Sequence, residues 1–248
     1  MPHIWLYTIA SIFVVSLISL IGVITLSVNL SKLKKAIIYL VSFSAGALLG
    51  DVFIHLIPET VEAGFTITTS SFILGGIVLF FALEKLIHWQ HCHAPITREH
   101  RHTFAIMNLI GDGFHNFLDG VIIGASYLVG TKIGIATTIA VMLHEIPQEI
   151  GDFGVLIHGG FKKSKALFFN FLSALTAFLG AAFALVASTY IENIELFLIP
   201  LAIGGFIYIA GSDLIPELHK DFETKKSIWQ LLIFIAGILI MAALLLLE

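Results

Sequence analysis

Apolar runs of about twenty residues dominate this chain and leave it few folds to adopt. A run of about 18 or more such residues is long enough to cross a bilayer as a helix. Eight runs recur along the 248 residues, and they cover about 4–29, 36–57, 67–88, 103–129, 132–158, 164–189, 194–216 and 227–247. Hydrophobic residues make up 58% of the chain, above the roughly 45–50% that is usual in soluble domains. The sequence therefore predicts an all-α, polytopic membrane protein with eight transmembrane helices.

Short connections between the runs leave almost no residues for a soluble domain. We therefore expect residues 1–248 to form a single transmembrane domain. The first run has no basic leader and no clear cleavage site, so we expect it to be retained rather than removed as a signal peptide. The single cysteine, Cys92, excludes an intramolecular disulfide.

Positive charge is distributed unevenly over the connections. Lys and Arg favour the cytoplasmic side of a membrane protein, and this bias sets its orientation. Twelve of the 13 basic residues lie in or beside the first, third, fifth and seventh connections, which share one side of the membrane. The other side has a single basic residue, Lys132, and four acidic ones, Glu59, Glu62, Glu192 and Glu195. This pattern predicts that both termini are non-cytoplasmic. We expect a multi-pass protein of the plasma membrane, which would be the inner membrane in a bacterium.

A histidine-containing stretch, HWQHCHAPITREHRH, follows the third run and carries five histidines beside Cys92. We expect residues 89–102 to form a cytoplasmic loop within the single domain. Histidine-rich tracts can bind metal, although the fixed spacing of a zinc finger is absent. A solvated, mostly disordered loop is the alternative interpretation.

One short motif occurs twice. HLIPE closes the second run at His55–Glu59, and DLIPE closes the seventh at Asp213–Glu217, with Gly46 and Gly204 also in register. The two runs cross the membrane in opposite directions, as in a transporter with an inverted-topology repeat. We expect spans 1–3 and 6–8 to form two three-helix bundles around spans 4 and 5. Chance similarity between short apolar segments is the alternative.

The fourth and fifth spans carry polar residues in their interior. Span four reads NLIGDGFHNFLDG and span five reads HEIPQEIGDF. Helical spacing of three and four places these residues on stripes; they are Asp112, His115, Asn116 and Asp119 on span four, and His144, Glu145, Gln148, Glu149 and Asp152 on span five. An ionisable side chain at the bilayer centre costs at least about 2.5–3.5 kcal/mol and usually faces an interior pathway. The stripes therefore indicate such a pathway, and a hydrogen-bonded network that only joins the helices is the alternative.

Pro147 interrupts span five within this polar segment. Proline has no backbone N–H, so the carbonyl one turn earlier loses its donor. We expect neighbouring groups or a water-filled cavity to satisfy that carbonyl. The mixture of imidazole, carboxylate and amide on the two spans suits a divalent first-row metal ion.

HNFLDG and HEIPQEIGDF resemble the signature segments of the ZIP family of zinc/iron-regulated-type metal transporters, and the second is closest to the HExPHExGD motif of its LIV-1 branch. The resemblance covers essentially the whole chain, including eight spans, outside termini and the histidine-rich loop. It implies transport of divalent cations, zinc first and Fe²⁺, Mn²⁺ or Cd²⁺ as alternatives, into the cytoplasm. It also implies inverted symmetry between the first and last three helices.

Carried over position by position, the resemblance implies that His115, Asp119 and His144 bind the primary metal ion. Asn116 and Glu145 match members of an adjoining second site. Gln148 replaces a histidine of the LIV-1 motif, and its neutral amide oxygen would be a weaker fourth ligand. Some members complete a two-metal centre with a carboxylate on span six, but ALFFNFLSALTAFLGAAFALVAS contains none.

The other polar residues carry weaker signals. His55 and Asp213 are either intermediate cation-binding residues near the two ends of the pathway or residues of the membrane interface. Glu149 and Asp152 either complete the pathway or bond one helix to another. We expect Glu59 and Glu62 to lie where the cation enters.

A different class of protein shares part of this pattern. HEIPQ is one residue away from the H-E-x-x-H motif, in which two histidines hold zinc and the glutamate acts as general base. Gln148 in place of the second histidine would leave such a protease short of a ligand. We therefore expect no enzyme, no catalytic residue and no resident cofactor. A metal ion and the lipid bilayer are the expected partners, a homodimer is left open, and neither a glycine-rich phosphate loop nor a basic aromatic surface for nucleic acid is present.

Overall fold

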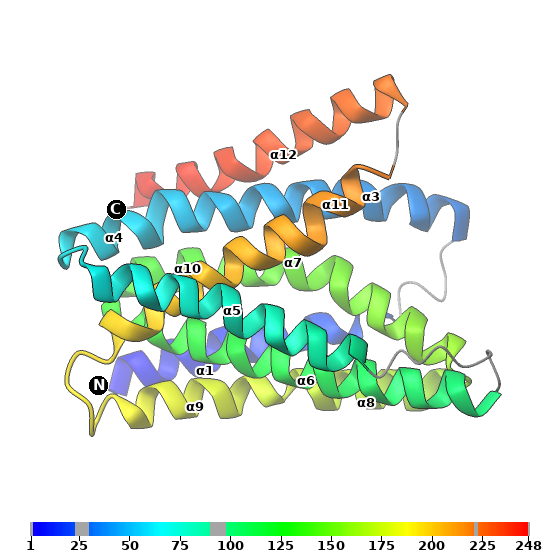
Figure 1. Ribbon diagram of the computed structural model, residues 1–248, viewed down its shortest axis with the longest axis horizontal. Helices are drawn as coiled ribbons and strands as arrows, with labels where there is room; N and C mark the ends of the chain where they lie inside the picture. The colour runs from blue at the N-terminus through cyan, green and yellow to red at the C-terminus, as the bar shows by residue number, and fades with distance from the viewer. Residues whose placement is uncertain (1, 23–29, 90–97, 221–222, 248) are drawn as a thin grey trace.

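The computed structural model describes residues 2–22, 30–89, 98–220 and 223–247, and helices are the only regular secondary structure in these ranges (Figure 1). Eleven are α-helices: α1 (Pro2–Ile18), α3 (Leu30–Gly50), α4 (Ile57–Glu62), α5 (Ile67–Trp89), α6 (Arg98–Val129), α7 (Thr131–His158), α8 (Lys163–Ala174), α9 (Thr176–Ala187), α10 (Glu195–Tyr208), α11 (Ile215–Leu218) and α12 (Thr224–Leu244). Two are 3₁₀-helices, η1 (Ser19–Ile21) and η4 (Leu245–Leu247), and two are π-helices, η2 (Asp51–Leu56) and η3 (Ile209–Leu214).

Six helical segments in the described part of the chain are long and apolar enough to cross a membrane. They are His3–Ile21, Ile37–Glu62, Ile67–Lys85, Lys163–Ala187, Glu195–Leu218 and Thr224–Leu244. The helices α6 and α7 have 32 and 28 residues, so at about 1.5 Å per residue each exceeds the roughly 30 Å of a bilayer core. Their polar stripes set them apart from the other six. The prediction of an all-α, polytopic membrane protein is confirmed.

Some predicted boundaries differ from the structure. The predicted sixth span, 164–189, consists of the two helices α8 and α9, which meet at Leu175. Helices also extend into the predicted loop 89–102, because α5 ends at Trp89 and α6 begins at Arg98. Residues 90–97 of that loop, including Cys92, lie outside the described residues.

The two halves of the repeat interleave. The helix α3 packs along α12, α10 packs along α5, α6 packs along α9, and α1 packs against α7. Close packing of α3 depends on Gly46, where an added Cβ would lie 2.0 Å from the Phe234 carbonyl oxygen of α12. Gly204 of α10 is its counterpart, with the Ile73 oxygen of α5 at the same 2.0 Å. Small residues permit such close approach of membrane helices, and their pairing across the halves corrects the expected separation into two three-helix bundles.

The repeated I-P-E motif has a structural counterpart. Each copy follows a six-residue π-helix, η2 before Pro58 and η3 before Pro216, and each π-helix ends two residues before its proline. The closing backbone bonds also match, with Ile57 N–H donating to the Val52 oxygen and Ile215 N–H to the Ala210 oxygen. Because π-helices are rare and occur mostly at functional sites, this match supports the inverted repeat.

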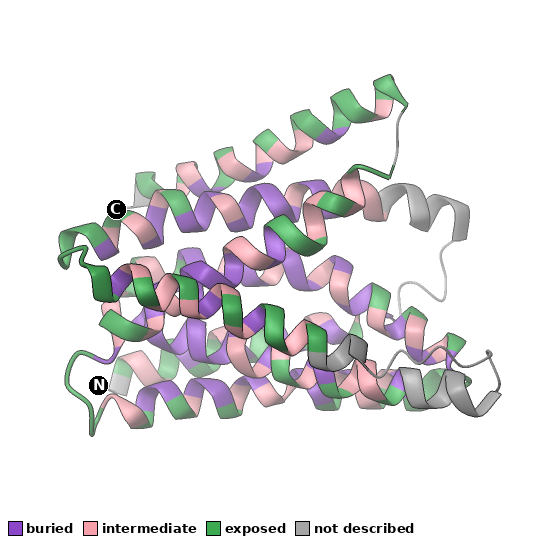
Figure 2. Cartoon of the chain, in the orientation of Figure 1, coloured by how far each residue is buried: buried purple, intermediate pink, exposed green. Residues whose placement is uncertain are grey.

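Burial divides the helices into an inner and an outer set. Buried residues are frequent along α6 and α7, whereas only 17% of the residues in the apolar stretches of α5 and α12 are buried (Figure 2). The exposed residues of α12 are largely apolar, such as Leu231 and Leu239, which is the composition of a lipid-facing surface. The polar stripes of α6 and α7 therefore lie inside a shell of apolar helices.

Candidate metal centre

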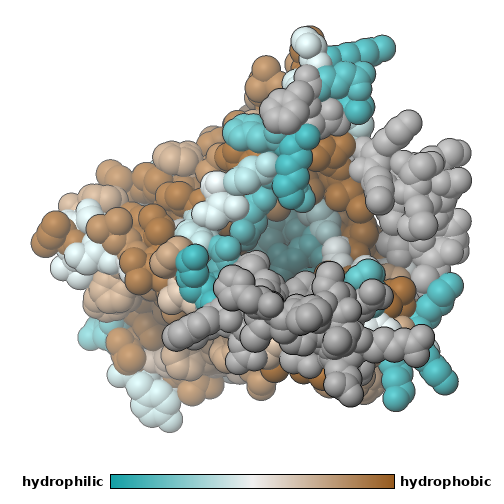
Figure 3. Space-filling view, turned by 45° about the vertical axis from the view of Figure 1, so that its right-hand side comes forward, coloured by the Kyte–Doolittle hydropathy of each residue, from teal (hydrophilic) through white to brown (hydrophobic). Residues whose placement is uncertain are grey.

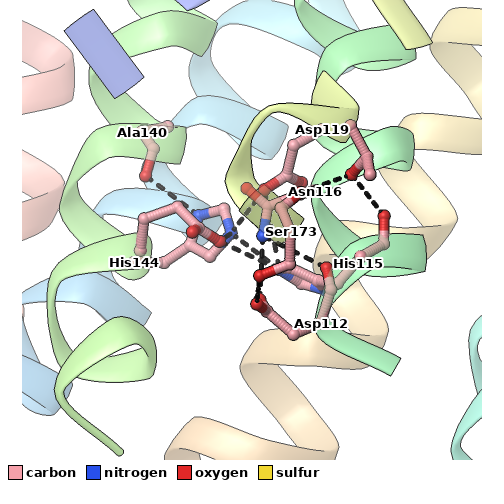
Figure 4. Close-up of polar contacts among 10 residues, drawn as sticks. Asp112, His115, Asn116, Asp119, Ala140, His144 and Ser173 are labelled. Atoms are coloured by element: carbon pink, nitrogen blue, oxygen red, sulfur yellow. Dashed lines mark hydrogen bonds and ion pairs between the residues drawn. The ribbon is translucent and has the colours of Figure 1, made fainter. Parts of the chain in front are cut away.

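Four ionisable side chains from α6 and α7 converge in the interior. His115 and Asp119 are one turn apart on α6, and His144 and Glu145 are adjacent on α7 (Figure 4 labels His115, Asp119 and His144). One potential ligand atom from each lies within 4.8 Å of the others. Three of the side chains are at most 1% exposed, and that of His115 is 14% exposed.

The separations between these atoms match a tetrahedral site. His115 Nε2 lies 3.3 Å from His144 Nε2, 3.3 Å from Glu145 Oε1 and 3.6 Å from Asp119 Oδ2. His144 Nε2 lies 3.4 Å from Asp119 Oδ2 and 3.6 Å from Glu145 Oε1. Ligands at about 2.0–2.2 Å from a tetrahedral zinc ion are separated by about 3.3–3.6 Å. All five distances fall in this range, so a zinc-sized cation fits at the centre.

The His144 ring is oriented for coordination. Its Nδ1 lies 3.2 Å from the Ala140 carbonyl oxygen, one turn earlier on α7. When Nδ1 carries the hydrogen and donates to this oxygen, the lone pair of Nε2 faces the cluster. The ring also makes an edge contact with Phe206, and that of His115 makes one with Phe80. Phe206 of α10 and Phe80 of α5 thus pack against the two imidazole rings.

Charge in the cluster balances a divalent ion. Asp119 and Glu145 supply two negative charges when ionised, and the imidazoles are neutral when they act as ligands. Both oxygens of Asp119 and Oε1 of Glu145 are buried without a hydrogen-bond donor. Buried charges are costly unless they are paired or coordinate a metal, so the chemistry of these donors also favours a divalent cation.

Pro147 shapes α7 beside the cluster. The helix runs through Pro147 without ending, and the carbonyl of Leu143 loses the N–H that a residue other than proline would provide. The Ser44 hydroxyl of α3 donates to this carbonyl oxygen. The expectation that a neighbouring group satisfies the freed carbonyl is therefore confirmed, and the bond joins α3 to α7 next to His144.

Asn116 lies one turn from Asp112 on α6. Its amide nitrogen donates to the Asp112 backbone oxygen at 3.1 Å and to Oδ1 at 2.8 Å. The other Asp112 oxygen accepts from the hydroxyl of Ser173 on α8 (Figure 4). The amide oxygen of Asn116 is buried without a donor. It is thus available to a ligand.

The predicted sixth span contributes neutral partners that the sequence did not single out. Asn170 of α8 donates to the buried carboxylate of Glu149, and Ser173 donates to Asp112. On α6, Asn108 donates to Oδ1 of Asp152 at 2.7 Å. Glu149 and Asp152 therefore bond one helix to another. Their signal in the sequence is the three-residue spacing of the polar residues Asn170, Ser173 and Thr176 in NFLSALT.

Gln148 lines a cavity beside the cluster. This cavity has a volume of about 350 Å³ and reaches His115, and its walls include Glu84, Asp112, Asp152 and Asp213. A hydrophilic hollow is visible in Figure 3 on the end of the molecule that lies to the right in Figure 1. The sequence-predicted residue Asp213 thus belongs to this cavity wall, whereas His55 is buried elsewhere, with Nε2 3.0 Å from the Met241 oxygen.

The helices and their buried cluster define a polytopic membrane protein with an internal group of side chains that could hold a divalent cation. Comparison with known proteins identifies the family. The chain belongs to the ZIP family, since the sequence model described as ZIP Zinc transporter matches residues 3–104 and 90–245.

Several relatives support this assignment. The zinc transporter ZIP13 of Pongo abelii is 34% identical over 222 residues, covering 82% of this chain and 65% of the relative. The ZIP13 protein of Mus musculus is 32% identical over 248 residues, covering 83% and 69%. The zinc transporter zipt-7.2 of Caenorhabditis elegans is 30% identical over 294 residues, covering 93% and 64%. The chain thus spans about two thirds of the length of these relatives.

The family assignment bears on two expectations from the sequence. It places the chain among transporters rather than enzymes and gives the protease interpretation no support. The three relatives are animal proteins, so they do not support the bacterial inner membrane. The chain is therefore an integral, multi-pass membrane protein of the ZIP family.

Proposed function

We propose that this protein carries divalent metal cations, zinc first, through the membrane into the cytoplasm. The observation that carries the proposal is the convergence of His115, Asp119, His144 and Glu145 at the separations of a tetrahedral site. In this proposal Glu145, rather than Gln148, is the fourth ligand of the primary ion. Asn116, through its free amide oxygen, is assigned to an adjoining position that a second ion would share with Glu145.

Two cavities support a route through the protein. The 350 Å³ cavity reaches the cluster at His115 and is lined by acidic side chains, which attract cations. A second cavity, of about 420 Å³, lies at the other end and includes Glu59 and Glu195 in its walls. Between this second cavity and the cluster lies a contiguous core of fully buried apolar side chains, among them Val52, Ile123 and Ile203. This arrangement fits a state that is open to one side only, as alternating access requires.

The positions of the lysines suggest how the protein is oriented in the membrane. The chain ends lie at the same end of the molecule in Figure 1, and the connection at 159–162 lies at the other. In our proposal the latter is cytoplasmic, so the 350 Å³ cavity is the inner vestibule and both termini are outside. The chain crosses the membrane eight times, residues 1–248 act as one transporter domain, and residues 89–102 contribute its cytoplasmic histidine-containing connection.

Metal uptake by purified protein in liposomes tests the function. Free zinc is added outside, and a metal-sensitive dye inside reports its arrival. His144→Ala should reduce uptake to the level of empty liposomes, because it removes a ligand on which the other atoms converge. His158→Ala is the matched control, since His158 ends the same helix but is exposed and outside the cluster.

Competition then defines the substrate. We expect Cd²⁺, Fe²⁺ and Mn²⁺ to inhibit zinc uptake in the order of their affinity for a mixed imidazole and carboxylate site, and Mg²⁺ to inhibit least because it keeps its waters. Uptake by His144→Ala at the rate of His158→Ala would refute the proposed site. Absence of uptake in the unmodified protein, after orientation has been checked, would refute the proposed function.

A further inference from the structure

A second buried carboxylate lies outside the metal centre. Asp51 is the first residue of the π-helix η2, and it is fully buried. The hydroxyl of Thr137 lies beside its carboxylate, and the described residues give the two oxygens no other hydrogen-bond partner. Asp119 is buried as well, but it faces two imidazoles. Asp51 lies in neither of the two cavities described above.

Within the described part of the chain, no cationic side chain pairs with Asp51. The polar group that faces it is the hydroxyl of Thr137 on α7, which is also fully buried and without any other partner. The helices packed against η2 are α3, α4, α7, α10 and α12. The titratable residues of these helices, counted on α3 from residue 37 where its described side chains begin, are Tyr39, Glu59, Glu62, Lys132, His144, Glu145, Glu149, Asp152, His158, Glu195, Tyr208, Lys225 and Lys226, and η2 itself adds His55.

Most of these groups are distant along their helices. On α7, Lys132 begins the helix and His144 belongs to the metal centre. On α10, Glu195 and Tyr208 are the two end residues. His55 is one turn from Asp51, but its Nε2 contacts the Met241 oxygen at 3.0 Å. Among the described residues, Thr137 is therefore the polar partner assigned to the Asp51 carboxyl, within a region of buried apolar side chains such as Leu48 and Val52.

Asp51 lies on the outer side of the metal centre. The helices α3 and α7 are antiparallel, since Ser44 bonds to Leu143 while Asp51 faces Thr137. Thr137 precedes His144 by seven residues on α7, which is about 10 Å along a helix. That displacement is away from the inner vestibule and toward the end that carries Glu59 and Glu195. The carboxyl thus lies within the apolar core that separates the outer cavity from the cluster.

An isolated charge in such a core is strongly disfavoured, and a carboxyl placed there is retained as the neutral acid. As an acid it gains an O–H that can donate to the Thr137 oxygen, so both orphaned groups are satisfied together. We propose that Asp51 is a proton-binding site of the outer gate, and that the outer half of the protein closes when Asp51 is protonated. This inference rests on the transport function and orientation proposed above.

The position of Asp51 determines where its proton comes from and returns to. The apolar core and the metal centre separate it from the inner vestibule. The proton therefore enters from outside before closure and leaves to the outside when the outer half opens and water reaches the carboxylate. One proton is bound and released on the same side in each cycle, so closure depends on outer pH without net proton transfer through Asp51.

Cysteine accessibility tests the gate independently of transport. Ala140→Cys, in a Cys92→Ala background, places a thiol between Thr137 and the metal centre at a fully buried position. We expect a membrane-impermeant thiol reagent added outside to label it faster as outer pH rises, after correction for the pH dependence of thiol reactivity by Tyr190→Cys, since Tyr190 is an exposed residue of the outer connection. Adding Asp51→Asn, which imitates the neutral acid, should keep the reporter protected at all outer pH values. Asp51→Glu should restore the dependence on pH.

Transport then tests the direction of the proton. At fixed inner pH and fixed free zinc, uptake by the unmodified protein should fall as outer pH rises, because Asp51 then no longer binds the proton that closes the outer half. Asp51→Asn, which holds the outer half closed, should reduce uptake to a low level that does not depend on outer pH. Glu192→Gln, an exposed acid-to-amide change in the outer connection, should leave the alkaline fall of uptake intact. Reporter labelling or an alkaline fall that is unchanged in Asp51→Asn would overturn the inference. So would a decrease, in Asp51→Asn, of the number of protons that move per zinc ion, because Asp51 would then carry protons across the membrane.

Discussion

The bond between Ser44 and the Leu143 carbonyl allows a sharp test of how the metal centre is built. Pro147 deprives this carbonyl of its usual donor, and the Ser44 hydroxyl takes that role from α3. The same hydroxyl lies 2.8 Å from the Leu40 oxygen of its own helix. Ser44→Ala removes the donor, whereas Pro147→Ala returns a backbone N–H to α7. The effect of Ser44→Ala should therefore depend on which residue occupies position 147.

The expected size follows from the bond that is lost. In membrane proteins, side-chain hydrogen bonds between helices contribute about 0.6 kcal/mol on average and about 1.7 kcal/mol at most. The Leu143 carbonyl is left without a donor when Pro147 is present, so we expect a coupling between the two changes in the upper part of that range. A coupling of about 1–1.7 kcal/mol corresponds to a factor of about 5–20 in the unfolding equilibrium.

Unfolding of the purified protein in mixed micelles by a denaturing detergent gives the four free energies of the cycle. Ser44→Ala should destabilise the protein that retains Pro147 and have little effect in the Pro147→Ala background. Ser42→Ala is the matched control, because its hydroxyl bonds to the Gln230 oxygen of α12 at 3.1 Å and its effect should not depend on position 147. Strictly additive effects of Ser44→Ala and Pro147→Ala would refute the proposed role of the bond.

The packing and the site support three other predictions. Gly120→Ala should strongly reduce the yield of folded protein, because the added Cβ would lie 1.9 Å from the Ala177 carbonyl oxygen. Gly113→Ala should be tolerated, because the nearest atom to its added Cβ is 3.8 Å away, and size-exclusion profiles in detergent compare the two variants. Asp119→Asn should raise the zinc concentration for half-maximal uptake by at least about 10-fold, because one of two balancing charges is lost; an unchanged value would argue against ligation. Gln148→Ala should change zinc affinity less than Glu145→Gln does, as measured by uptake at varied free zinc, and the reverse order would restore Gln148 as the fourth ligand.

The sequence indicated the centre through residues whose chemistry is costly in a membrane. Only a partner could compensate the burial of Asp119 and His144, so their spacing on two helices already predicted convergence. It could not distinguish Glu145 from Gln148 as the fourth group, because both lie on the same face of α7 and the choice depends on how α6 and α7 are rotated. The ligand assignments remain predictions that the uptake experiments test.

Other features of the structure could not be predicted from the apolar spans of the sequence. The interleaving of the halves depends on pairs such as Gly46 with Phe234, which are distant in the sequence and have no local signature. Neutral partners such as Ser44 and Asn170 were passed over because serine and asparagine within helices also bond to their own backbone. The π-helices were hidden for a similar reason, since the repeated I-P-E motif marks their position but not the extra residue that each one accommodates.

That extra residue has a consequence for how the two halves tolerate insertions and deletions. A π-helix of this kind corresponds to one residue added to an α-helix, and each α-helical residue turns the chain by about 100°. Deleting one residue within η2 would therefore rotate the α4 face that carries Glu59 relative to α3, and the same deletion within η3 would rotate the α11 face that carries Glu217 relative to α10. Because each copy has this extra residue at the same point before I-P-E, we expect the length of the chain at η2 and η3 to tolerate less change than the identity of its exposed side chains.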